Sequence, residues 1–137
     1  TGSVYCWGRN NEAQLGTGAT STTPSRSPVN ALGALGTSVR VAAGGGHSCA
    51  VNSAGETHCW GINTYGQLGD LSTTLRPSGV LIAGSNLFAT ITAAASHTCG
   101  TRLDGATFCW GWNYLGRLGV GSFNGSNYPF PAQVVVP

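Results

Sequence analysis

The residues best suited to chemistry in this chain are its cysteines. Four of the five form two pairs with the same internal spacing, Cys49 with Cys59 and Cys99 with Cys109. A hairpin centred near residue 54 places positions 49 and 59 opposite each other, and facing Cβ atoms of a non-hydrogen-bonded pair lie within disulfide reach. The second pair repeats this arrangement around residue 104. The spacing therefore predicts two disulfides, each of which crosses one hairpin.

A metal site is the alternative for the same residue types, because nitrogen and sulfur ligands could come from His47, Cys49, His58 and Cys59. The position of His58 is occupied in the second hairpin by Phe108, and a phenyl ring cannot bind a metal ion. The pattern favours disulfides over metal ligands. We expect no metal site and no cofactor.

Two disulfides indicate an oxidising compartment, so we expect an extracellular or cell-surface protein. The fifth cysteine, Cys6, matches Cys59 and Cys109 in its surroundings, and its partner would lie about ten residues before it. The chain is therefore expected to be part of a longer polypeptide. Assembly from several copies is the alternative.

The histidines favour a structural role over catalysis. His47 and His97 each stand two residues before a paired cysteine, and a group that recurs once per unit suits a repeated hydrogen bond to a neighbouring loop. Ser48 cannot form a catalytic pair with His47, because adjacent residues of a strand point to opposite faces. The four carboxylates are scattered along the chain. We do not expect an enzyme.

Composition narrows the classes of partner. The 137 residues are 41% hydrophobic and only 7% charged, and all six basic residues are arginine. A net charge of +2 without a basic cluster does not predict nucleic-acid binding. The sequence also lacks an apolar run long enough for a membrane span.

These residues belong to a repeated unit. A segment that starts with Cys-Trp-Gly and ends with Leu-Gly occupies residues 6–16, 59–69 and 109–119. His47 and His97 are 50 positions apart, as are Trp60 and Trp110. A constant period of this length is typical of stacked or radially arranged units.

Short strands account for most of each unit. Alternating or proline-led apolar residues predict strands at 3–8, 28–32, 39–43, 47–52, 56–61, 77–82, 89–95 and 131–136. Val39 and Val41 are expected on a buried face, and residues 17–27 are expected to form a loop. No segment has a helical period. Gly55 and Gly105 are expected to close the two hairpins in a left-handed conformation.

Four such strands make up a propeller blade. With the proline-led strand placed first, the sequence divides into a single region of about two and three-quarter blades: 1–27 ends a first blade, 28–76 and 77–130 form two complete blades, and 131–137 begins another. The expected fold class is all-β, a partial ring of a β-propeller.

The sequence resembles the regulator of chromosome condensation 1 (RCC1) repeat family, in a secreted form that carries disulfides. The resemblance rests on residues 42–51, Gly55 and residues 59–69, with echoes at 93–101, Gly105 and 109–119. It implies a β-propeller of about seven four-stranded blades. Ala13 departs from the family pattern, which puts the positive φ of that turn in doubt, and Arg117 replaces a glutamine with little expected structural effect. Nothing in the chain matches a guanine-nucleotide exchange motif.

Three tryptophans recur at one position of the unit, and burial of such large rings dominates local packing. We expect Trp7, Trp60 and Trp110 to be wedges between blades. Positions that vary within the fixed repeat are the candidate binding surface: Arg9, Ile62 and Trp112 in one slot, Asn11, Thr64 and Tyr114 in a second, and Glu12, Tyr65 and Leu115 in a third.

The aromatic content of these slots suggests what they bind. Tyr65, Trp112, Tyr114, Phe123 and Tyr128 form a rich aromatic set for so polar a chain. Exposed Tyr and Trp suit protein contacts or self-assembly, and they also suit stacking on sugars. The sequence favours a non-catalytic protein-interaction scaffold, with carbohydrate binding as the alternative. Residues 124–126 match an N-glycosylation acceptor.

Overall fold

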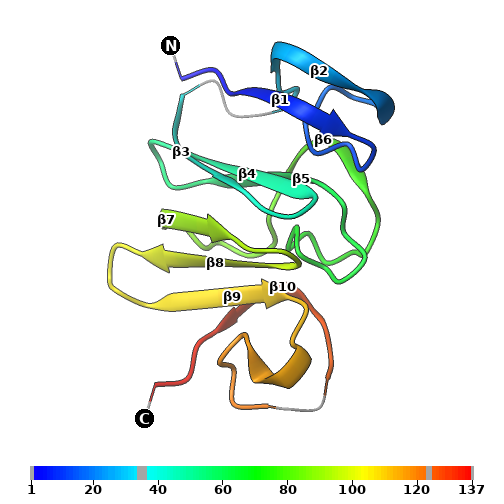
Figure 1. Ribbon diagram of the computed structural model, residues 1–137. Coiled ribbons are helices and arrows are strands. Elements are labelled where there is room, and N and C mark those ends of the chain that lie inside the picture. The colour runs from blue at the N-terminus through cyan, green and yellow to red at the C-terminus, as the bar shows by residue number, and fades with distance from the viewer. Residues whose placement is uncertain (1, 34–36, 123–124, 137) are drawn as a thin grey trace.

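A computed structural model describes residues 2–33, 37–122 and 125–136 of the chain. Figure 1 shows sheets that follow one another from the N-terminus to the C-terminus. The elements are β1 (Tyr5–Asn10), β2 (Ser21–Asn30), β3 (Ser38–Ala43), β4 (His47–Asn52), β5 (Thr57–Gly61), β6 (Arg76–Leu81), β7 (Phe88–Ala93), β8 (His97–Arg102), β9 (Thr107–Gly111), the 3-10 turn η1 (Tyr114–Gly116) and β10 (Tyr128–Gln133). None of the helical segments in these ranges could cross a membrane.

The strands form antiparallel sheets in which chain neighbours are also spatial neighbours. Two sheets have four strands, β3-β4-β5-β6 and β7-β8-β9-β10, and β1 pairs with β2. Meandering four-stranded sheets of this kind are propeller blades, so the expected fold class is confirmed.

The sheets divide the chain differently from the sequence-based blades. β6, which begins at Arg76 and Pro77, pairs with β5 and therefore ends one sheet, whereas the division at 28–76 and 77–130 made it the start of the next. β10 likewise ends the third sheet, which corrects the assignment of 131–137 to a further blade. Proline has no N–H to donate, so an outermost strand with one unpaired edge accommodates it.

The segment 17–27 is also corrected, because β2 begins at Ser21 within it. β2 runs beside β1, with Asn10 opposite Ser21 and Gly8 opposite Ser25. Most of β2 is exposed. Its polar composition signalled a loop, but pairing with β1 satisfies its backbone and a solvent-facing edge strand requires no apolar side chains.

Both predicted disulfides are present. In β4 and β5 Cys49 lies directly opposite Cys59, and the Cα atoms of each bonded pair are 4.1 Å apart. Gly55 and Gly105 close the two hairpins with φ of 89° and 86°. Each pair of central strands is therefore covalently fixed across its own hairpin.

The core lies between successive sheets. Trp60 and Trp110 are fully buried, as predicted, and Trp110 packs in a cluster with Leu68, Phe88 and Ile91. Trp60 packs with Val4, Ala31 and Ala50 in a second cluster. These two tryptophans join each four-stranded sheet to the unit before it.

Trp7 does not follow this pattern among the described residues, so its predicted role as a wedge stays a prediction. Its side chain is 66% exposed. Trp60 and Trp110 are covered by the loop of the preceding unit, and no such loop lies against Trp7 within the described residues.

The expected buried face of β3 is also wrong, because Val39 and Val41 are 51% and 65% exposed. A groove of about 450 Å³ separates β1 from β3 and β4, and Val41, Cys6 and Trp7 line it. Within the described ranges the sheet on the far side of this groove has two strands, β1 and β2, and Val41 remains exposed to the groove. The Cys6 thiol is half-buried, and this burial raises its pKa.

Candidate functional site

The candidate surface lies on the loops that follow β1, β5 and β9. In each loop a buried asparagine accepts a hydrogen bond from the backbone N–H of a buried leucine five residues later, at 3.0 to 3.2 Å. Asn63 and Asn113 are fully buried, whereas their neighbours Thr64 and Tyr114 are exposed. The asparagine thus holds the loop from inside while the variable side chains face outward.

The same loops share a left-handed residue. Gly66 and Gly116 have φ of 79° and 73°, and Ala13 takes φ of 59° at the corresponding position. The loop after β9 has a second left-handed residue, Leu115 with φ of 57°, so the three loops do not share one shape, but Ala13 does adopt the turn shape that its side chain put in doubt. The inward asparagine bond keeps that shape despite the Cβ atom.

The loop after β9 differs at Arg117. In the other two loops a glutamine side chain accepts a backbone hydrogen bond, from Glu12 to Gln14 and from Tyr65 to Gln67, both at 2.9 Å. Arginine has no acceptor atom. Arg117 instead donates from Nε to the carbonyl of Tyr114 at 2.9 Å, so the expectation that this replacement changes little is wrong.

Arg117 completes a group that we call the aromatic cluster: Tyr65, Trp112, Tyr114 and Arg117. Trp112 stacks with Tyr65 at a centroid distance of 5.0 Å and with Tyr114 at 5.2 Å. The Arg117 guanidinium lies 4.3 Å from the centroid of Trp112 and 5.5 Å from that of Tyr114. Half of Tyr114 is exposed, and Tyr65 and Trp112 are partly exposed.

The aromatic cluster joins two blades. Tyr65 belongs to the loop after β5, and Trp112 to the loop after β9. A slot-three residue of one unit therefore contacts a slot-one residue of the next. Glu12 is the slot-three residue of the first unit, and Ile62 is the slot-one residue of the second. Side-chain atoms of both lie next to Gly46, so this pair is also brought close together.

The other predicted surface residues lie outside the cluster. Arg9 forms an ion pair with Glu12 at 3.2 Å, and Asn11, Thr64 and Leu115 are exposed on their own loops. Tyr128 packs edge-on against Phe130 at 6.0 Å and takes no part in the stacking of Tyr65, Trp112 and Tyr114. Phe123 and the acceptor Asn124 lie outside the described residues.

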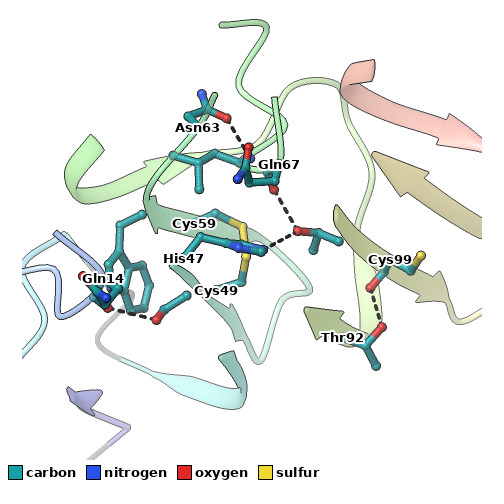
Figure 2. The surroundings of a disulfide bond; sticks show 12 residues. Gln14, His47, Cys49, Cys59, Asn63, Gln67, Thr92 and Cys99 are labelled. Atoms are coloured by element: carbon teal, nitrogen blue, oxygen red, sulfur yellow. Dashed lines mark hydrogen bonds between the residues drawn. A yellow bond between two sulfur atoms is a disulfide. The ribbon is translucent and has the colours of Figure 1, made fainter. Parts of the chain in front are cut away.

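His47 contacts the neighbouring unit through a hydrogen bond. His47 Nε2 lies 2.8 Å from Thr98 Oγ1, and the Thr98 hydroxyl donates to the carbonyl of Gln67 at 2.7 Å. Because that hydroxyl proton is used, the imidazole must donate from Nε2. Figure 2 shows His47 and Gln67 beside the Cys49–Cys59 disulfide.

Burial, together with the nearby charge of His97, lowers the pKa of His47 to about 4. Ser48 serves the same structural purpose, since its hydroxyl donates to the carbonyl of Gln14 at 2.9 Å. Within the described ranges no three His, Cys, Asp or Glu residues gather as metal ligands would.

Sequence reasoning located three members of the cluster and missed the fourth. Tyr65, Trp112 and Tyr114 were candidates because they vary within the repeat, but nothing in the sequence brings them together. Arg117 could have been found from its place in the slot that holds glutamine in both other units.

Comparison with known proteins agrees with the repeat. A family model described as "Regulator of chromosome condensation (RCC1) repeat" matches residues 1–51 and 104–137, and a second model with this description matches residues 39–67.

Among similar curated proteins, human E3 ubiquitin-protein ligase HERC2 is 38% identical over 78 residues, which cover 56% of this chain and 2% of that protein. The Arabidopsis thaliana ultraviolet-B receptor UVR8 is 34% identical over 92 residues, 66% of this chain and 21% of that protein. The chain thus matches at most about a fifth of the length of these two relatives.

Among solved structures, Prp20p of Saccharomyces cerevisiae aligns with a TM-score of 0.84 at 19% identity, over 98% of this chain and 34% of that chain. Its crystal structure was described together with its binding to Gsp1p and histones. At this level of identity the likeness concerns the fold.

Proposed function

The chain belongs to the regulator of chromosome condensation (RCC1) repeat family, and we propose that it is a non-catalytic protein-interaction unit whose contact surface is the aromatic cluster. The stacking of Tyr65, Trp112 and Tyr114 across two blades is the observation that supports this function. Protein binding by Prp20p, which shares the fold, is consistent with it.

The composition of the cluster suits a protein partner. Trp, Tyr and Arg are the residue types that supply most binding energy at protein interfaces. Mutual stacking fixes the rings of Trp112 and Tyr114 before a partner arrives, so little side-chain entropy is lost on binding. Stacked rings also leave fewer open faces for a sugar, which favours a protein over the carbohydrate alternative.

We further propose that the protein works in an oxidising compartment, outside the cell or at its surface. The two hairpin disulfides support this location, because such bonds persist where glutathione and thioredoxin do not reduce them. Thiol labelling of native protein, followed by mass spectrometry, tests it. Labelled Cys49 or Cys59 in freshly isolated material would contradict an oxidising compartment.

Peptide display on the folded chain tests protein recognition. We expect selected peptides to lose most of their binding to Trp112→Ala, and to keep it with Leu103→Ala. Leu103 is a suitable control because it is 94% exposed on the hairpin turn between β8 and β9. Peptides that bind both variants equally well would refute the role of the cluster.

A glycan array decides the alternative. Glycan binding that Trp112→Ala removes, without any peptide that depends on Trp112, would assign the surface to carbohydrate. No glycan binding is expected from the wild-type chain.

A further inference from the structure

The four carboxylates of the chain are already engaged. Three of them form ion pairs, Arg9 with Glu12 at 3.2 Å, Arg76 with Asp70 at 2.7 Å and Arg102 with Asp104 at 2.8 Å. The fourth, Glu56, accepts a hydrogen bond from Asn52 at 2.7 Å. None of them is within ion-pair distance of Arg117 among the residues that the structure describes.

The region around Arg117 is also poor in acids. After Asp70 the sequence contains one further acidic residue, Asp104, and this residue is the partner of Arg102. The positive charge of Arg117 reaches His97: burial lowers the pKa of that imidazole, and the charge of Arg117 lowers it further. The aromatic cluster therefore carries the charge of Arg117 without an acidic partner among the described residues.

The Arg117 side chain is held in place by its own loop. Its Nε donates to the Tyr114 carbonyl, and its guanidinium lies over the rings of Trp112 and Tyr114. The terminal nitrogens have no hydrogen-bond partner among the described residues, so their four N–H groups remain for an acceptor. A planar guanidinium fixed on aromatic rings matches a carboxylate through two parallel hydrogen bonds.

We propose that the partner presents an acidic peptide segment to the aromatic cluster, with an Asp or Glu carboxylate on Arg117 and apolar atoms against Trp112 and Tyr114. This proposal rests on the proposed function and adds the chemistry of the partner. Charge complementarity carries it, because Arg117 lies on aromatic rings, unlike Arg26 and Arg40, which also form no ion pair within the part of the chain that the structure describes.

The test uses two peptide libraries of identical design, one with Glu and one with the isosteric Gln at the varied polar positions. Binding to the folded chain is measured by fluorescence anisotropy at low and at physiological salt. We expect the selected Glu peptides to bind about 10- to 100-fold more tightly than their Gln counterparts, because a hydrogen bond to a charged group is worth about 1.5 to 3 kcal/mol. Added salt should reduce this difference.

Arg117→Gln is the decisive variant, because both other units carry glutamine here and its side chain can accept the loop N–H as Gln14 and Gln67 do. It should bind Glu and Gln peptides equally. Arg26→Gln removes the same charge from the exposed strand β2 and should retain the wild-type preference. A circular dichroism melt verifies that both variants are folded.

The outcomes separate the two levels of the proposal. Peptides that depend on Trp112 but show no preference for Glu would overturn the acidic segment and leave protein recognition intact. The absence of any Trp112-dependent peptide would overturn both. Binding of acidic polysaccharides such as heparin, without binding of Glu peptides, would replace the peptide by an acidic glycan. Equal losses in Arg26→Gln and Arg117→Gln would reduce the effect to net charge.

Discussion

Replacement of Trp60 by alanine should be among the most destabilising single changes in the chain. The indole is fully buried between the first two sheets, and its Nε1 donates to the carbonyl of Gln14 at 3.0 Å. Its ring is close enough to Gly16 that a Cβ atom there would lie 2.8 Å from Nε1. The ring therefore fills the space between two units and also bonds to one of them.

The expected cost of Trp60→Ala is about 3 to 5 kcal/mol in the free energy of unfolding, the range for deleting a large aromatic side chain from a core. The lost hydrogen bond adds little, because the Ser48 hydroxyl also donates to the Gln14 carbonyl and that acceptor stays satisfied. Trp60→Phe keeps most of the packing, so it should cost clearly less than Trp60→Ala.

Urea unfolding, followed by far-UV circular dichroism with the disulfides intact, measures these costs. Trp7→Ala is the matched control at the same position of the repeat, and it should change stability by less than about 1 kcal/mol because Trp7 is 66% exposed. Equal losses for Trp7→Ala and Trp60→Ala, or a near-neutral Trp60→Ala, would refute the assignment of Trp60 as the wedge between sheets.

Three further changes probe other parts of the fold. The pKa of His47 is about 4 in the folded chain, below its usual 6.5, so the unfolded chain binds the proton more readily. The free energy of unfolding should therefore fall by about 3 kcal/mol from pH 6.5 to pH 4. Urea titrations across this range should show a weaker dependence of that free energy on pH for His47→Gln. The double change Cys49→Ala and Cys59→Ala opens a loop with a sequence separation of 10 and should lower the free energy of unfolding by about 2 to 3 kcal/mol. An unchanged midpoint of urea unfolding would contradict this expectation. Gly69→Ala and Gly105→Ala both place alanine at a positive φ, which should cost about 1 to 2 kcal/mol in Gly105→Ala. Of these two positions, only Gly69 would bring the new Cβ against an indole nitrogen, at 2.7 Å. Thermal melts should therefore show a larger loss of stability for Gly69→Ala than for Gly105→Ala.

The hairpins could be predicted from the sequence because their signals are local. The spacing of Cys49 and Cys59, with Gly55 between them, defines both the register and the turn, and the structure has both as predicted. A repeat adds a second copy of the same evidence. The sheet content and the propeller class follow from these local units.

Two features could not be predicted from the sequence because they depend on what lies next to an element. The sequence of β6 predicts a strand, but its proline-led start does not indicate whether the strand ends one sheet or begins another. Trp7 and Trp60 occupy equivalent positions, yet among the described residues Trp60 is buried and Trp7 is 66% exposed. Exposure is a property of the neighbouring unit, so a pattern within one unit cannot report it.

The candidate site was predictable in location and not in composition. Buried asparagines, Asn63 and Asn113, hold the backbone of each loop, so the side chains next to them are free to vary without loss of the fold. The resulting variation among the three units is what identified these positions in the sequence as candidate binding residues. The stacking of Trp112 on Tyr65 arises only because consecutive blades bring slot one of one unit against slot three of the unit before it.

This arrangement places the contact surface on the seam between blades, and it links recognition to the packing of the fold. Trp110 fills the space between the two sheets, and two residues later Trp112 carries the stack on the outside of the same seam. Any movement of one blade against the other would separate Tyr65 from Trp112 before it altered either loop. The buried indole therefore stabilises the chain and also holds the aromatic cluster in the geometry that a partner would contact.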